Sequence, residues 1–192
     1  MSISFTRRHF ILGLLVGMII GATLIIPRLA SQPECAITPA TRQDFAEAIA
    51  IGADVFEPDI WRLETGEHPA LISVGWFDDE HEAIAHSQYL LYNCGYTQAD
   101  IDNFYGNENM KIMLGGYTSW QQTAICQQND ITLREFTMDY DGTPFAMRFW
   151  IQPVNDKRVR DINVAFAVKD ANLMDQYAAR LFPDLTSCAG KT

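Results

Sequence analysis

The stretch TPFAMRFWIQPVNDKRVRDINVAFAV, residues 143–168, carries the clearest structural signal in the chain. Large apolar residues occupy alternate positions in both of its halves, a period of two that is typical of β-strands because neighbouring side chains point to opposite faces of a sheet. Asn155-Asp156-Lys157 separates the halves and favours a turn. The stretch therefore predicts antiparallel strands over 143–152 and 159–168, with one dry face and one mixed face.

Neighbouring segments extend this sheet. Residues 120–127 and 131–139 show strand patterns, and the turn signal Asp141-Gly142 follows them. Nearer the N-terminus, strand patterns over 59–64 and 70–77 flank the polar residues 65–68, which predicts a further hairpin with its turn there.

Helical patterns lie between the strands. Thr41 with Asp44 predicts a helix start, and Pro58 ends that helix. Asp79 with Glu82 predicts a second helix, whose buried stripe comprises Ala83, Ile84, Leu90, Leu91 and Cys94.

The rest of the domain continues this alternation. Thr97 with Asp100 predicts a short third helix, and residues 103–116, rich in asparagine and glycine, favour a loop. A last helix is expected from Asp170 to Pro183, with a buried stripe of Leu173, Met174, Tyr177, Leu181 and Phe182. We expect an α+β fold: an N-terminal transmembrane helix followed by a two-layer domain, a mostly antiparallel sheet with helices on one face.

The N-terminal segment sets the expected domain organisation. Residues 10–26 are an uncharged apolar run, slightly short of the roughly 20 residues that span a bilayer. Arg7 and Arg8 precede it and favour a cytoplasmic N-terminus. Small residues for signal-peptide cleavage are poorly placed, the best candidate being after Ser31, so both a retained anchor and a cleaved leader stay open. We divide the chain into an anchor or signal segment (1–30), a linker (31–40) and an exported domain (41–192).

Gly13, Gly17 and Gly21 fall at a spacing of four within this run. On a helix they share one face, where a second membrane helix can approach closely. The spacing favours a docking helix whose partner is a membrane protein complex, although glycines are also common in signal segments.

Charge and cysteine placement point to the same compartment. Three of the 14 basic residues, Arg7, Arg8 and Arg28, precede the first acidic residue, leaving 11 basic residues against 24 acidic ones. Such a surface repels phosphate backbones, so nucleic acid is not an expected partner. The four cysteines all follow the apolar run and lack zinc-site spacing, which favours disulfides in an oxidising compartment. Of the three possible pairings, we favour Cys94 with Cys126 and Cys35 with Cys188.

Candidate chemistry is sparse. His81 and His86 are five residues apart, not the four that places two histidines on one helix face, so no metal site is expected. No cofactor motif is recognised, and a small-molecule ligand stays unidentified. Arg134 and Arg148, on neighbouring predicted strands, could form with Trp150 a patch for an anionic ligand or a partner's acid if they share a face. Cross-strand pairs with local carboxylates, and a tryptophan in the core, are the alternative.

Two resemblances add to these patterns. Thr6-Arg7-Arg8-His9-Phe10-Ile11 resembles the twin-arginine export signature, with Leu12 where that family usually has lysine. TLREFT (132–137), RFW (148–150) and LFPDLTSC (181–188) resemble uncharacterised exported proteins of cyanobacteria, and the order of elements is similar to that of the PsbP-like proteins of the thylakoid lumen. The resemblance implies a periplasmic or lumenal setting.

The expected function follows from location rather than from chemistry. We expect a non-catalytic accessory, assembly or structural subunit of a membrane protein complex, held in the cytoplasmic or thylakoid membrane with its main domain in the periplasm or lumen. The alternative is a soluble periplasmic or lumenal ligand-binding protein released by signal cleavage. A periplasmic hydrolase is third, because paired acids become visible only in three dimensions.

Overall fold

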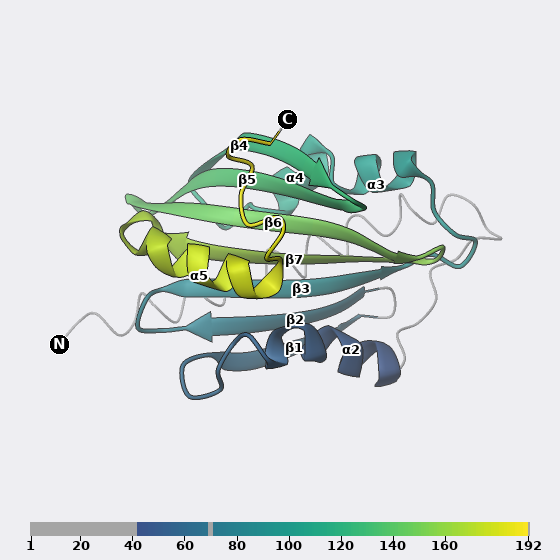
Figure 1. The fold of residues 1–192 in the computed structure, drawn as a ribbon, viewed down its shortest axis with the longest axis horizontal. Helices are drawn as coiled ribbons and strands as arrows, with labels where there is room; N and C mark the ends of the chain where they lie inside the picture. The colour runs from purple at the N-terminus through teal and green to yellow at the C-terminus, as the bar shows by residue number, and fades with distance from the viewer. Residues whose placement is uncertain (1–41, 69–70, 192) are drawn as a thin grey trace.

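The structure is a computed structural model that describes residues 42–68 and 71–191. Within them, seven strands form one sheet in the order β1-β2-β3-β7-β6-β5-β4, and each neighbouring pair is antiparallel (Figure 1). The strands are β1 (Arg62–His68), β2 (Leu71–Asp78), β3 (Ala83–Leu91), β4 (Ser119–Gln128), β5 (Ile131–Tyr140), β6 (Thr143–Asn155) and β7 (Arg158–Ala167). The helices are α2 (Arg42–Ala53), α3 (Gln98–Phe104), α4 (Asn107–Met113), the 3-10 turn η1 (Val168–Asp170) and α5 (Ala171–Leu181).

Two antiparallel meanders, β1-β2-β3 and β4-β5-β6-β7, make up the sheet. They join where β3 pairs with β7, so the chain leaving β3 crosses to the far edge of the sheet before it enters β4. We call residues 92–118 the crossing segment, and the helices α3 and α4 lie in it. The expected α+β class and the antiparallel sheet are therefore confirmed.

The strands expected from residues 120–168 are β4 to β7. In the hairpin of β6 and β7, Met147 pairs with Ala165 and Phe149 pairs with Asn163. The earlier hairpin also forms, but β1 continues to His68, so residues 65–68 pair with β2 and do not make the turn.

Residues 83–91 form a strand, and the helix predicted there is wrong. All nine residues of β3 are buried. A strand covered on both faces loses the alternation of apolar and polar residues, so its sequence fits a helical stripe equally well. The acids before it make a turn: Asp78 Oδ1 accepts hydrogen bonds from the backbone N–H groups of Glu80 (2.9 Å) and His81 (3.1 Å).

The crossing segment contains one expected helix and one unexpected helix. At the start of α3, the Thr97 side chain accepts from the Asp100 N–H and the Asp100 carboxylate accepts from the Thr97 N–H, which is the predicted capping box. The loop expected over 103–116 instead includes α4. Its buried Met110 and Met113 pack against the sheet, and this tertiary contact outweighs the weak helical tendency of a seven-residue segment.

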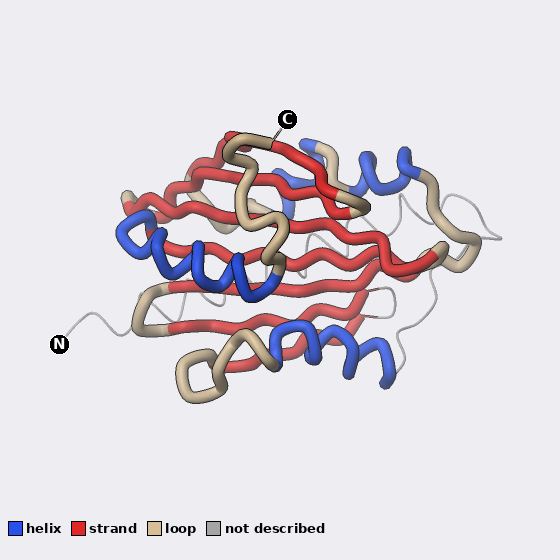
Figure 2. Tube along the Cα trace, in the orientation of Figure 1, coloured by secondary structure: helices blue, strands red, loops and turns tan. Residues whose placement is uncertain are grey.

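Apolar side chains form one cluster on each face of the sheet, so the expectation of helices on one face only is wrong. The α3 and α4 helices bring Ile101, Phe104 and Met110 to the first cluster, which includes Phe145, Met147 and Phe149 of β6. The opposite face is covered by α5 and by the segment around α2, both in front of the strands in Figure 2. Since the side chains of β6 and β7 that face α3 and α4 are largely apolar, that face also has to be covered.

The C-terminal segment after α5, residues 182–191, completes the second face, and we call it the strap. It runs across β6 and β5 towards β4 (Figure 1). The Trp150 indole donates a hydrogen bond to the Leu185 carbonyl (2.8 Å), and Cys188 forms a disulfide with Cys126 of β4. The strap is therefore tied to the sheet by a covalent bond and by a buried hydrogen bond.

This disulfide corrects the expected pairing. Cys126 and Cys188 bond to each other, with Cα atoms 5.5 Å apart, so neither of the two favoured pairs exists. Cys94 is disulfide-bonded as well, and Cys35 lies outside the described residues. Sequence spacing did not reveal the pair because only the path of the strap brings the C-terminus to the edge strand.

The predicted export signal at Arg7 and Arg8 and the glycines Gly13, Gly17 and Gly21 also lie outside the described residues. Among the residues that are described, no helix has the length and apolar character needed to cross a membrane.

Replacing both Cys126 and Cys188 with alanine is expected to lower the free energy of unfolding by about 4 kcal/mol. The disulfide joins residues 62 apart in sequence and so restricts the unfolded chain. Urea unfolding of the double variant against the oxidised parent measures the loss. Ser187→Ala is the control and should leave the urea midpoint unchanged, whereas a loss below about 1 kcal/mol in the double variant would contradict a structural role.

Candidate functional site

Five polar side chains gather on the face of the sheet that α3 and α4 cover, and we call them the polar cluster. They are Ser73 of β2, His86 and Gln88 of β3, and Asp161 and Asn163 of β7. Gln88 is paired with both Ser73 and Asp161, and His86 is paired with Asn163. Cross-strand pairing therefore sets all five on one face, next to one another.

The polar cluster interrupts an apolar surface. Ile84, Leu90, Val159 and Ala165 share its strands and its face, and they belong to the core that α3 and α4 cover. Asp161 is 0% exposed, Asn163 2%, His86 3% and Gln88 6%. Burying such groups costs free energy unless hydrogen bonds replace those made with water, so the partners of each atom matter.

Asp161 is the centre of the main hydrogen-bond network. Its Oδ2 atom accepts from the Tyr105 hydroxyl (2.6 Å) and from the Gln88 amide (2.5 Å). Tyr105 directly follows α3 and is fully buried, so the crossing segment supplies one of the two donors. A second, shorter chain joins His86 Nε2 to the Ser73 hydroxyl (2.5 Å).

Burial shifts the pKa values of these groups in opposite directions. Burial raises the pKa of the Asp161 carboxyl to about 7, although the hydrogen bonds from Tyr105 and Gln88 lower it. Burial also lowers the pKa of the His86 imidazole to about 4. At neutral pH His86 is therefore uncharged, while Asp161 divides between its two protonation states.

Three atoms of the polar cluster have no hydrogen-bond partner among the described residues. They are Asp161 Oδ1, Asn163 Oδ1 and His86 Nδ1. Buried polar atoms of folded proteins usually have a partner, and these three lie together on the paired strands β3 and β7. The main network satisfies one oxygen of the Asp161 carboxylate and leaves the other unpaired.

The arrangement differs from a Ser-His-Asp triad. Ser73 and His86 make one hydrogen bond, but Asp161 bonds to Gln88 and Tyr105 rather than to the second ring nitrogen of His86. A triad needs that contact because the carboxylate orients the imidazole and stabilises its charged form.

The two histidines considered for a metal site contact different side chains. The His81 Nδ1 contacts the Asp78 carboxylate (2.7 Å), whereas His86 contacts Ser73. Within the described ranges, no group of three His, Cys, Asp or Glu side chains is placed to hold a metal ion.

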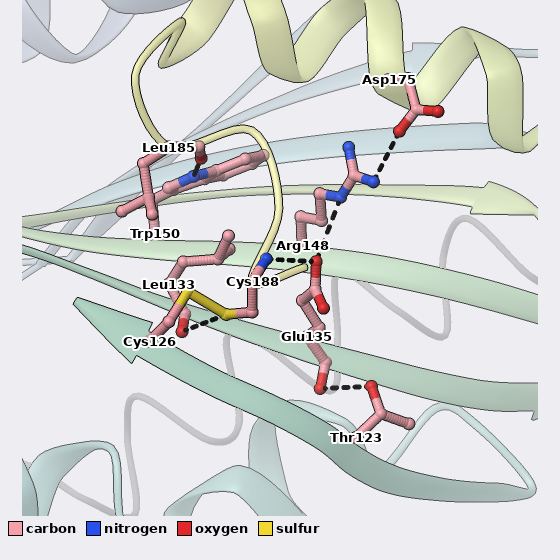
Figure 3. A network of polar contacts seen from close by, with 9 residues as sticks. All are labelled: Thr123, Cys126, Leu133, Glu135, Arg148, Trp150, Asp175, Leu185 and Cys188. Atoms are coloured by element: carbon pink, nitrogen blue, oxygen red, sulfur yellow. Dashed lines mark hydrogen bonds and ion pairs between the residues drawn. A yellow bond between two sulfur atoms is a disulfide. The ribbon is translucent and has the colours of Figure 1, made fainter. Parts of the chain in front are cut away.

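The predicted patch of Arg134, Arg148 and Trp150 does not form. On the α5 face, Arg148 contacts the carboxylates of Asp175 (2.6 Å) and Glu135 (3.6 Å), as Figure 3 shows. Glu135 also accepts a hydrogen bond from the Cys188 N–H (3.2 Å), which links this network to the strap. Trp150 lies in the core with 0% exposure.

Arg134 lies on the opposite face. Its guanidinium donates to the Tyr105 carbonyl (2.6 Å), and burial lowers its pKa. In the pairing of β5 with β6, Arg148 is level with Glu135 and Arg134 is level with Phe149, so the two arginines point to different sides of the sheet. They serve as separate structural contacts.

Sequence reasoning missed the polar cluster for two reasons. His86 and Gln88 lie in the segment whose pattern predicts a helix, and Asp161 and Asn163 lie on the strand face whose pattern predicts a mixture of polar and apolar residues. The available signal is the pair of polar residues at alternate positions, Asp161 and Asn163, in the stretch 161–168, whose other residues are all apolar.

Comparisons with solved structures give weak similarities, of which two are described here. No protein-family model matches the chain, and no curated protein sequence matches it. The structure of LpqN, involved in cell envelope biogenesis of Mycobacterium tuberculosis, aligns with a TM-score of 0.34 and 15% identity over 66% of this chain and 78% of that one. Human STARD10 aligns with a TM-score of 0.28 and 9% identity over 79% of each chain. With scores this low, neither likeness bears on function.

Asp161→Asn is expected to stabilise the protein in mildly alkaline buffer. Because the folded carboxyl has the higher pKa, the folded state holds the proton more tightly, and wild-type stability falls as the pH rises from about 4 to about 7. The shift corresponds to about 4 kcal/mol. Urea unfolding should show similar stabilities near pH 4 and a gain approaching that value near pH 8. Asp59→Asn, at an exposed position, is the control, and an equal gain there would contradict the assignment.

His86 is expected to impose the opposite slope. Its folded pKa lies below the unfolded value of 6.5, so its contribution to stability is present above that pH and is lost as the pH falls towards about 4. In the Asp161→Asn background, stability should therefore rise by about 3 kcal/mol between these limits. Adding His86→Gln to Asp161→Asn should remove the rise in stability. His81 is retained in the single and the double variant, so its titration is the same in both. Persistence of the full rise in the double variant would assign it to another group.

Proposed function

We propose that this chain is a membrane-anchored, extracytoplasmic accessory subunit of a membrane protein complex, and that it acts by binding rather than by catalysis. The buried disulfide between Cys126 and Cys188 carries the proposal, because structural disulfides persist in oxidising compartments. The bond joins the edge strand β4 to the strap that closes one face of the core. An oxidising setting therefore suits the fold.

The N-terminal sequence supports the anchor. The uncharged run over residues 10–26 approaches the length of a membrane span, and Arg7 and Arg8 favour a cytoplasmic N-terminus. A helix oriented in this way places the domain outside the cytoplasm. The twin-arginine resemblance is consistent with that direction of transport.

The surface supports binding to a protein of neutral or positive charge. Acidic residues outnumber basic ones by 24 to 14 over the whole chain. A charge excess of this kind repels anionic partners and favours cationic ones. Because helices, loops and the strap cover both sheet faces, the exposed surface consists of these elements and the sheet edges.

A second candidate function is ligand binding by a protein released from the membrane. The polar cluster favours it, since Asp161, Asn163 and His86 each keep a buried atom without a partner among the described residues. The two candidates differ in the fate of the N-terminal segment.

Gly17→Leu is expected to separate the full-length protein from its complex. Bulk on the glycine face prevents close approach of a second helix. The measurement is the apparent mass of the tagged protein on a native gel after mild detergent extraction of membranes. The parent should migrate with a large complex and the variant as a smaller species.

Ala22→Leu adds bulk off the glycine face and is the matched control, which should leave the large complex intact. A small soluble parent that lacks its first residues would reject the anchored subunit and favour the released ligand-binding protein.

A further inference from the structure

The unpartnered atoms of the polar cluster share one chemical property. Asp161 Oδ1 and Asn163 Oδ1 are hydrogen-bond acceptors. His86 Nδ1 is a third acceptor when the Nε2 atom carries the ring proton and donates it to the Ser73 hydroxyl. Two alternate positions of β7, and on β3 the residue that pairs with Asn163, thus present acceptors that no donor of the described residues reaches.

Among the described residues, no cation pairs with the charge of the polar cluster. The Asp161 carboxyl is ionised above about pH 7, and the groups beside it, Gln88, Tyr105 and Tyr92, are neutral at that pH. The Arg134 guanidinium lies on the same face but donates to the Tyr105 carbonyl rather than to the carboxylate. A buried carboxylate without a cation is costly, so a positive group bound there would stabilise the ionised form.

Three acceptors and one negative charge match a protonated primary amine, which offers three N–H donors, a positive charge and no acceptor. We propose that the polar cluster is a binding site for a small organic ammonium ion, which donates to Asp161 Oδ1 and Asn163 Oδ1. This inference goes beyond the accessory role and does not depend on it. Tyr105 and Met113, which contact Asp161 and Gln88 from the crossing segment, restrict the ligand to a small one.

The test uses the oxidised full-length chain in detergent micelles near pH 8, with methylammonium chloride as the probe. Nuclear magnetic resonance of the His86 ring should show a saturable shift. Tetramethylammonium at equal ionic strength carries the same charge without N–H donors and should give none. Asp161→Asn should weaken methylammonium binding at least about tenfold, because it removes the charge and keeps the side-chain shape.

Asn163→Leu provides a second variant with the same number of side-chain heavy atoms and should also weaken binding, while Asp59→Asn should bind like the parent. A saturable, donor-dependent shift that both cluster variants weaken supports the site. Absence of a saturable shift in the parent, an equal shift with tetramethylammonium, or unchanged binding in Asp161→Asn or Asn163→Leu would each overturn it. These outcomes are independent of whether the chain migrates with a membrane complex.

Discussion

Pairing of β3 with β7 joins two meanders into one sheet, and most other features of the structure depend on it. The ladder runs from Ile84 opposite Ala165 to Leu91 opposite Arg158. It places both strands in the middle of the sheet, where each is covered on both faces. It also forces the chain after β3 to cross the sheet, which positions α3 and α4 and brings Tyr105 to Asp161. Without this ladder each meander would expose another edge and the polar cluster would be divided between them.

Charged side chains on the two faces of the sheet have different kinds of partner. On the α5 face, Arg148 lies between the carboxylates of Glu135 and Asp175, so opposite charges offset each other. On the other face, Asp161 has neutral hydrogen-bond donors but no paired cation among the described residues. The first arrangement links strands, helix and strap. The second contains a buried carboxylate whose pKa is set by burial and two hydrogen bonds. Perturbed pKa values of this kind are typical of sites that bind or respond to another group.

The strap shows how an edge strand is held without a neighbour on its outer side in the described sheet. β4 pairs only with β5, and a bulge interrupts that pairing between Gln122 and Ala124. Bulges of this kind discourage pairing with another chain. The Cys126–Cys188 disulfide adds a covalent tie across the core, so the stability of this edge is coupled to the redox state of the compartment.

Short sequence patterns correctly predicted the strands, turns and helix cap that depend on neighbouring residues. The alternation over residues 143–168, the turns at Asp141-Gly142 and Asn155-Lys157, and the capping box of Thr97 with Asp100 each depend on a few adjacent residues, and the structure contains all of them. The identity of β3 was hidden because burial on both faces removes the period of two.

Tertiary structure alone decided what depends on register and on the path of the chain. Arg134 and Arg148 lie on paired strands, yet a register that sets Glu135 opposite Arg148 sends the arginines to different faces, because side chains alternate. In the same way, the path of the strap places Cys188 beside Cys126. The β3–β7 ladder brings Gln88 and Asp161 of the polar cluster together, although they are more than 70 positions apart in sequence. Sequence specifies which groups a strand carries, but which groups meet is set by long-range packing, since no local property of the chain encodes the distance between two strands.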